Sequence, residues 1–249
     1  QELRLLFAPV MRLVDDAPVA AEAVLHWDHP QHGLLPLDDF AAAAERAGLT
    51  VPVGAWALRE ACRAAAAWNC PGVDDGWAVA VAVSARQVQA SGFAATVAAA
   101  LADAGLPAAR LAVEVTEATV LDSGAAARAL TEVAALGVTV TLDRFGAGHS
   151  ALGVLHAVPA GALTVDGALV ERATAGGADA SVAAALVTIA RGFDLTLVAR
   201  GVATAAQVRT LAAMGYRYAQ GPHFGGPLAD LRACGVPAGR AGAVAPVGP

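Results

Sequence analysis

Short apolar runs alternate with longer stretches of helical spacing along most of the chain. The apolar runs are typical of buried strands and cover residues 4–7, 10–14, 19–27, 77–83, 111–117, 138–143, 163–166, 195–200 and 218–219. The helical stretches cover residues 40–47, 53–68, 92–104, 123–136, 151–157, 179–192 and 204–215. This alternation predicts a parallel sheet, and about eight strands in one domain favour closure of that sheet into a barrel.

Turn and capping residues delimit several of these elements. Asp38 and Asp39 precede the helix at 40–47 and are expected to cap it, while Gly48 and Gly105 end two helices. No glycine fingerprint follows the first strand, which disfavours a dinucleotide-binding sheet. We therefore predict one α/β domain over residues 1–230. A tail rich in Gly, Pro and Ala follows at 231–249, and we expect it to be poorly ordered.

The composition narrows the class of protein. Hydrophobic residues make up 57% of the chain and charged residues 15%, which argues against intrinsic disorder. The net charge of −6 argues against a nucleic-acid polymer as partner, because such binders carry basic patches. No apolar stretch reaches the roughly 18 residues of a membrane span. Cys62, Cys70 and Cys234 form no CxxC pair, and we expect reduced thiols in a cytoplasmic protein.

Three acidic residues and one arginine lie within or at the ends of predicted strands. Glu22 interrupts the run at 19–25, Glu114 lies inside another run, and Asp143 and Arg200 each end one. Catalytic and binding residues of a barrel lie where strands end and loops begin. A carboxylate on a buried strand costs several kcal/mol unless it is paired or bound to a metal. The pattern indicates a site at this end of the barrel, and acids exposed in loops are the alternative.

These residues belong to a series of motifs that resembles one known family over nearly the whole chain. The motifs are FAPV at 7–10, EAV at 22–24 with HWDHP at 26–30, EVTE at 114–117, DRFGAGHS at 143–150, VARGVAT at 198–204 and QG at 220–221. Their order is similar to that of EAL domains, the cyclic di-GMP phosphodiesterases of bacteria. Each motif is weak alone, and their common order is what makes the resemblance specific.

The resemblance implies a modified TIM (β/α)8 barrel of the EAL type. In active members it also implies a pair of Mg²⁺ or Mn²⁺ ions, held by carboxylates and one asparagine, with a lysine near the nucleophilic water. Such ions prefer oxygen ligands and activate a water that opens one phosphodiester of cyclic di-GMP. Glu22, Glu114 and Asp143 keep the ligand type that the family uses at these positions.

Other positions depart from the family pattern. The residues that replace the implied functional residues are Ala82 for the asparagine, Arg144 for a second aspartate, Thr164 for the lysine, and Arg200 and Ala203 for two glutamates. We therefore expect a pseudoenzyme without a metal cofactor. We also expect Arg144 and Arg200 to form salt bridges with Glu22, Glu114 or Asp143, because guanidinium groups pair with carboxylates in a planar, bidentate way.

The same end of the barrel is a candidate ligand pocket. Its candidate residues are Glu22, His26, Arg86, Glu114, Asp143, Arg144, Arg200 and Gln220. His26 replaces a phosphate-binding arginine of the family, and Arg86 is either a solvated loop residue or a retained phosphate contact. Zinc binding by His26, His29 and His32 is disfavoured because Pro30 prevents a shared helix face.

Three functions remain open from the sequence. The first is an inactive EAL-like domain that serves as a regulatory or protein-interaction module, with an unidentified protein partner. The second is a non-catalytic receptor for cyclic di-GMP, and the third is a weak residual phosphodiesterase. A homodimer through the loop that carries Phe145 is a further expectation.

Overall fold

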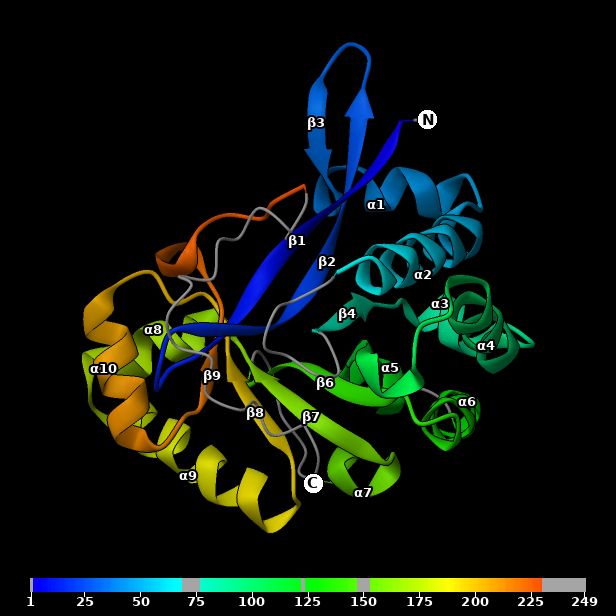
Figure 1. Cartoon of the computed structure of the whole chain (residues 1–249). Helices are drawn as coiled ribbons and strands as arrows, with labels where there is room; N and C mark the ends of the chain where they lie inside the picture. The colour runs from blue at the N-terminus through cyan, green and yellow to red at the C-terminus, as the bar shows by residue number, and fades with distance from the viewer. Residues whose placement is uncertain (1, 69–76, 122–123, 147–152, 230–249) are drawn as a thin grey trace.

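The computed structural model describes residues 2–68, 77–121, 124–146 and 153–229, and the tail at 231–249 lies outside them. The strands are β1 (Leu3–Arg12), β2 (Ala17–His29), β3 (Gly33–Pro36), β4 (Ala78–Ala82), β5 (Leu111–Thr116), β6 (Thr139–Phe145), β7 (Ala160–Val165), β8 (Thr196–Ala199) and β9 (Tyr218–Ala219). Their order in the sheet is β1-β9-β8-β7-β6-β5-β4-β2-β3, and β1 also pairs with β2. The sheet therefore closes into a barrel, with β3 outside the ring (Figure 1).

The prediction of an entirely parallel sheet is wrong at β1. This strand runs antiparallel to both of its barrel neighbours, β2 and β9, whereas the strands from β2 through β4 to β9 pair in parallel. The reason is the connection at 13–16, which joins β1 to β2 and is too short for a helical crossover. The runs predicted separately at 4–7 and 10–14 belong to one strand, because β1 pairs with β2 through Ala8 and Pro9, which lie between them.

Helices surround the barrel and cover its outer face (Figure 1). The α-helices are α1 (Leu37–Arg46), α2 (Thr50–Ala66), α3 (Ala85–Gln89), α4 (Phe93–Ala104), α5 (Glu117–Leu121), α6 (Gly124–Ala135), α7 (Val154–Ala157), α8 (Gly167–Ala175), α9 (Ala178–Gly192) and α10 (Ala205–Met214). The pattern missed α3, α5 and α8, and also β3. Asp38 and Asp39 do not cap α1: they lie in its first turn, after the capping residue Pro36.

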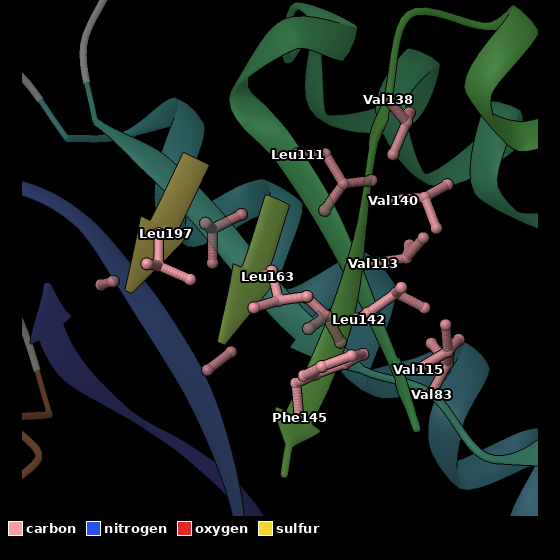
Figure 2. Close-up of a cluster of buried hydrophobic side chains, with 14 of the residues drawn as sticks. Val83, Leu111, Val113, Val115, Val138, Val140, Leu142, Phe145, Leu163 and Leu197 are labelled. Atoms are coloured by element: carbon pink, nitrogen blue, oxygen red, sulfur yellow. The ribbon is translucent and has the colours of Figure 1, made fainter. Parts of the chain in front are cut away.

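The main apolar core includes the layer between strands and helices (Figure 2). Alternate side chains of a strand point to opposite faces, and β5 illustrates the consequence. Leu111, Val113 and Val115 belong to this core, while Glu114 between them lies on the inward face and is also buried. The fold thus requires that a carboxylate on the barrel interior find partners there.

In the described residues, no single helix combines the length and hydropathy needed to cross a bilayer. Among the residues that the structure describes, α8 and α9 pass this test when taken together, and a bend of 119° separates them.

Candidate functional site

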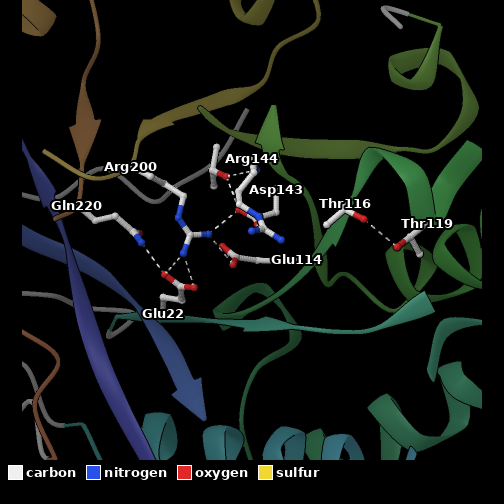
Figure 3. Close-up of polar contacts among 9 residues, drawn as sticks. Glu22, Glu114, Thr116, Thr119, Asp143, Arg144, Arg200 and Gln220 are labelled. Atoms are coloured by element: carbon white, nitrogen blue, oxygen red, sulfur yellow. Dashed lines mark hydrogen bonds and ion pairs between the residues drawn. The ribbon is translucent and has the colours of Figure 1, made fainter. Parts of the chain in front are cut away.

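A cluster of charged side chains gathers inside the barrel where its strands end. Glu22 on β2, Glu114 on β5 and Asp143 on β6 surround the guanidinium of Arg200, which follows β8 (Figure 3). We call these four residues the arginine–carboxylate cluster. The sequence placed all four within or at the ends of predicted strands, and the closed barrel brings them together.

Arg200 is the centre of the cluster. Its Nη2 atom donates to both carboxylate oxygens of Glu22, at 2.5 and 2.6 Å, and its Nη1 atom donates to Asp143 Oδ1 at 2.5 Å. The same Nη1 atom lies 3.6 Å from Glu114 Oε2. The predicted salt bridges of Arg200 are therefore confirmed for Glu22 and Asp143, while Glu114 lies at a longer distance.

The backbone around Arg200 fixes the direction of its side chain. The Arg200 N–H donates to the carbonyl of Val165 at 3.1 Å, which ties the end of β8 to β7. The next residue, Gly201, has a φ of +72°, and a Cβ there would lie 3.1 Å from the Cα of Gly167. Glycine at 201 therefore permits both the turn and the close approach of the two loops.

Two further side chains complete the hydrogen bonding of the ionised acids. Gln220 Nε2 donates to Glu22 Oε2 at 2.5 Å, and Thr164 Oγ1 donates to Asp143 Oδ1 at 2.6 Å. The sequence assigned Thr164 only as a replacement for lysine and missed this role. No local pattern could have indicated it, because residues 143 and 164 are brought together by the pairing of β6 with β7.

Glu114 differs from the other two acids. It is 5% exposed, and its Oε2 atom has no hydrogen-bond partner among the described residues. Burial, reinforced by repulsion from Glu22, raises the pKa of Glu114 well above its usual value despite the attraction of Arg200. Burial lowers the pKa of Arg200, but Glu22, Asp143 and Glu114 together raise it by more, so its guanidinium stays charged.

Arg144 meets the prediction only in part. Its Nε atom lies 3.6 Å from Asp143 Oδ2, and no salt bridge joins it to Glu22 or Glu114 in the described structure. Its side chain is 60% exposed, against 20% for Arg200. The two arginines of the site therefore have different surroundings, one enclosed by acids and one facing solvent.

The remaining candidate residues divide into two groups. Gln220 belongs to the cluster through its bond to Glu22. Arg86 is exposed and pairs with Glu45 on α1 at 2.9 Å, and His26 lies half-buried on β2 with its Nδ1 atom 3.0 Å from the carbonyl of Val24. The structure thus joins neither Arg86 nor His26 to the arginine–carboxylate cluster by a direct contact. The homodimer was expected through the loop that carries Phe145. Phe145 is the last residue of β6 and is buried, while residues 147–152, which follow it after Gly146, lie outside the described residues, so the dimer stays a prediction.

The residues present do not fit the metal pair that the resemblance implies. The oxygen atoms of Glu22 and Asp143 that would face a cation accept hydrogen bonds from Arg200, and the methyl group of Ala82 offers no ligand. Within the described part of the chain, no group of three or more His, Cys, Asp or Glu residues has a geometry that could hold a metal ion. A positive charge already occupies the position between the acids.

Comparison with known proteins establishes the family. A model of the EAL domain matches residues 1–227. The chain belongs to the EAL domain family of cyclic di-GMP phosphodiesterases. It is 36% identical over 229 residues to the bifunctional diguanylate cyclase/cyclic di-GMP phosphodiesterase MucR of Pseudomonas aeruginosa, covering 92% of this chain and 33% of MucR. An uncharacterised Mycobacterium bovis protein is 35% identical and is covered over 74% of its length.

Solved structures agree with the barrel described above. The MucR phosphodiesterase in complex with cyclic di-GMP superposes with a TM-score of 0.84 at 36% identity, covering 91% of this EAL domain and 92% of that chain. The EAL domain of Mycobacterium smegmatis DcpA gives a TM-score of 0.75 at 29% identity, with 91% and 92% covered. The chain spans about a third of the length of MucR and of an uncharacterised protein from Synechocystis that it also matches.

Proposed function

We propose that this EAL domain does not hydrolyse cyclic di-GMP and serves as a regulatory, protein-interaction module in cyclic di-GMP signalling. The observation that supports this proposal is the position of the Arg200 guanidinium between Glu22, Glu114 and Asp143. The chain keeps the barrel of its family, while the positive charge at the centre of the site belongs to a side chain of the protein and not to a metal ion. A protein with this arrangement retains its surfaces for partners without the chemistry of its relatives.

The electrostatic argument against hydrolysis is direct. A divalent ion at this position would have to displace the hydrogen bonds of Arg200 to Glu22 and Asp143 and lie beside a guanidinium that cannot lose its proton. Two positive charges in contact, the divalent ion and the guanidinium, repel strongly in a site with little solvent. Without a bound ion, the site lacks the metal-bound water that supplies the nucleophile in metal-assisted hydrolysis.

The proposal is tested by incubating the purified protein with cyclic di-GMP and Mn²⁺ and separating the products by chromatography. MucR phosphodiesterase serves as the positive control. We expect no linear dinucleotide, and we expect calorimetric titration with Mn²⁺ to give no stoichiometric binding at micromolar concentration. Linear product above the protein-free blank, abolished by Glu22→Gln, would refute the proposal.

A second candidate function is that of a non-catalytic cyclic di-GMP receptor. It is supported by the 36% identical MucR domain, whose structure is a complex with that nucleotide. The arginines also reduce the negative charge that would otherwise repel a phosphodiester. Calorimetry with cyclic di-GMP separates the two candidates: a micromolar dissociation constant favours the receptor, and no heat up to millimolar nucleotide favours a module that acts through protein contacts alone.

A further inference from the structure

Arg144 is the charged residue of the site whose binding capacity is least used. A guanidinium offers five N–H donors. The side chain of Arg144 makes no hydrogen bond to any described residue, and its one ion pair, with Asp143, is 3.6 Å long. Other exposed arginines pair more closely, as Arg4 does with Asp28 at 2.5 Å and Arg172 with Asp179 at 3.2 Å.

The Asp143 carboxylate offers Arg144 only one of its two oxygens. Its Oδ1 atom already accepts from Arg200 at 2.5 Å and from Thr164 at 2.6 Å, which leaves Oδ2 as the atom nearest to Arg144. Moving the Arg144 side chain toward a ligand would therefore break one long ion pair and no hydrogen bond. The reorganisation needed to bind an anion is small.

The backbone at Arg144 is held in an unusual conformation. Its φ is +51°, in the left-handed region that costs a residue with a Cβ of order 1 kcal/mol. The Arg144 N–H donates to Thr164 Oγ1 at 2.9 Å, and that hydroxyl in turn donates to Asp143. Strained conformations that the surroundings hold in place are concentrated at ligand-binding sites. Thr164 thus links the position of Arg144 to the arginine–carboxylate cluster.

The surrounding charge permits an anion to approach. Arg200 is shared between Glu22 and Asp143, and burial favours the protonated, neutral form of Glu114. Glu22 and Asp143 then exceed the charge of Arg200 by one negative unit, which Arg144 balances, so the site presents no net negative charge to an approaching anion. Its exposed guanidinium can place two parallel N–H groups against two oxygens of a phosphate, which is the geometry that arginine prefers.

From this geometry we propose that Arg144 binds the phosphate oxygens of a phosphodiester ligand directly, without a divalent cation. The inference deepens the second candidate function, the non-catalytic receptor, and rests on the proposed loss of hydrolysis, since it assigns to a side chain the anion contact that metals would otherwise make. The same chemistry would admit inorganic phosphate, so the ligand source has to be separated by experiment. The bases of a dinucleotide would add stacking and hydrogen bonds that free phosphate lacks.

The test is calorimetric titration of the whole chain in EDTA, with cyclic di-GMP and with inorganic phosphate as separate probes. We expect cyclic di-GMP to bind the wild type, and Arg144→Gln to weaken it about tenfold or more, as loss of a charged hydrogen bond does. Arg144→Lys should restore part of the affinity, because it keeps the charge but loses the fork. Arg172→Gln, another exposed arginine in an ion pair, is the matched control and should bind as the wild type does.

The outcomes separate this inference from the proposed function. Equal affinity of the wild type and Arg144→Gln, or no binding of cyclic di-GMP to the wild type in EDTA, overturns the role of Arg144. Tight binding of inorganic phosphate that competes with the nucleotide assigns the site to free phosphate and overturns the phosphodiester. Linear product formed with Mn²⁺ refutes the loss of hydrolysis whatever the affinity in EDTA. Thermal unfolding of each variant shows whether an altered affinity reflects loss of fold.

Discussion

The two faces of β5 are buried by different physical means. On the outer face, Leu111, Val113 and Val115 pack in the apolar core, where stabilisation is non-directional and scales with the area removed from water. On the inner face, Glu114 lies beside Arg200, and buried charged groups of this kind are tolerated only when a partner of opposite charge lies next to them. The apolar layer therefore depends on the volume that its side chains fill, whereas the arginine–carboxylate cluster depends on the balance of its charges.

The sharpest way to break this comparison is Arg200→Met. The substitution leaves Glu22 and Asp143 buried without their cation, and we expect the free energy of unfolding to fall by about 3–5 kcal/mol. Urea denaturation measures the loss. Arg172→Met, which removes an exposed arginine of a surface pair, is the control and should change stability little. A loss for Arg200→Met as small as that of the control would contradict the claim that Glu22 and Asp143 depend on the charge of Arg200.

A triple variant sharpens the same point. Adding Glu22→Gln and Asp143→Asn to Arg200→Met removes the ionised acids together with their cation. If the loss in the single variant comes from uncompensated charge, the triple variant should regain most of it, because replacing all members of a buried ion network is often nearly neutral. A triple variant less stable than Arg200→Met would show that the acids contribute by themselves.

In the apolar layer, the corresponding change is Leu58→Ala on α2. Leu58 is fully buried, and we expect a loss of about 3 kcal/mol from transfer and cavity terms, measured by the same urea denaturation. Leu121→Ala removes an exposed leucine and should have little effect. Equal losses at both positions would contradict the assignment of the core.

The smallest expected effect is on the pH dependence. Because the pKa of Glu114 is raised in the folded protein, the folded state binds its proton more tightly than the unfolded chain does. The contribution of Glu114 to the free energy of unfolding is therefore fully present below about pH 4.5, the usual pKa of a glutamate, and is lost as the pH rises through its raised pKa in the folded protein. The loss amounts to about 1.4 kcal/mol for each unit by which the two pKa values differ. Glu114→Gln should remove this slope, and Glu132→Gln, an exposed control, should keep it.

Most elements on the outer layer could be predicted from the sequence. The helix ending at Gly105 follows from glycine at a C-terminus, and the helix predicted at 204–215 is found at Ala205–Met214, where the structure adds a capping box of Thr204 with Gln207. The elements that were missed are short, like α3 and β3, or, like α8, begin right after a strand. A pattern of a few residues carries too little periodicity to separate a helical turn from a loop.

The candidate site was predictable in its members but not in its arrangement. Strand position and residue type singled out Glu22, Glu114, Asp143 and Arg200, and the hypothesis of salt bridges holds for Arg200. The pattern treated Arg144 and Arg200 alike, and it gave Thr164 no partner. Their differences arise from which backbone atoms and hydroxyls lie nearby once β6, β7 and β8 are paired.

The sequence by itself determined the alternation of strands and helices, the family, and the reversal of charge at positions 144 and 200, because these depend on local periodicity and on residue identity. Only the tertiary structure decided that one guanidinium would lie among three acids while the other faces solvent. The physical reason is that contacts between residues 178 positions apart, such as Glu22 with Arg200, exist only after the barrel has closed.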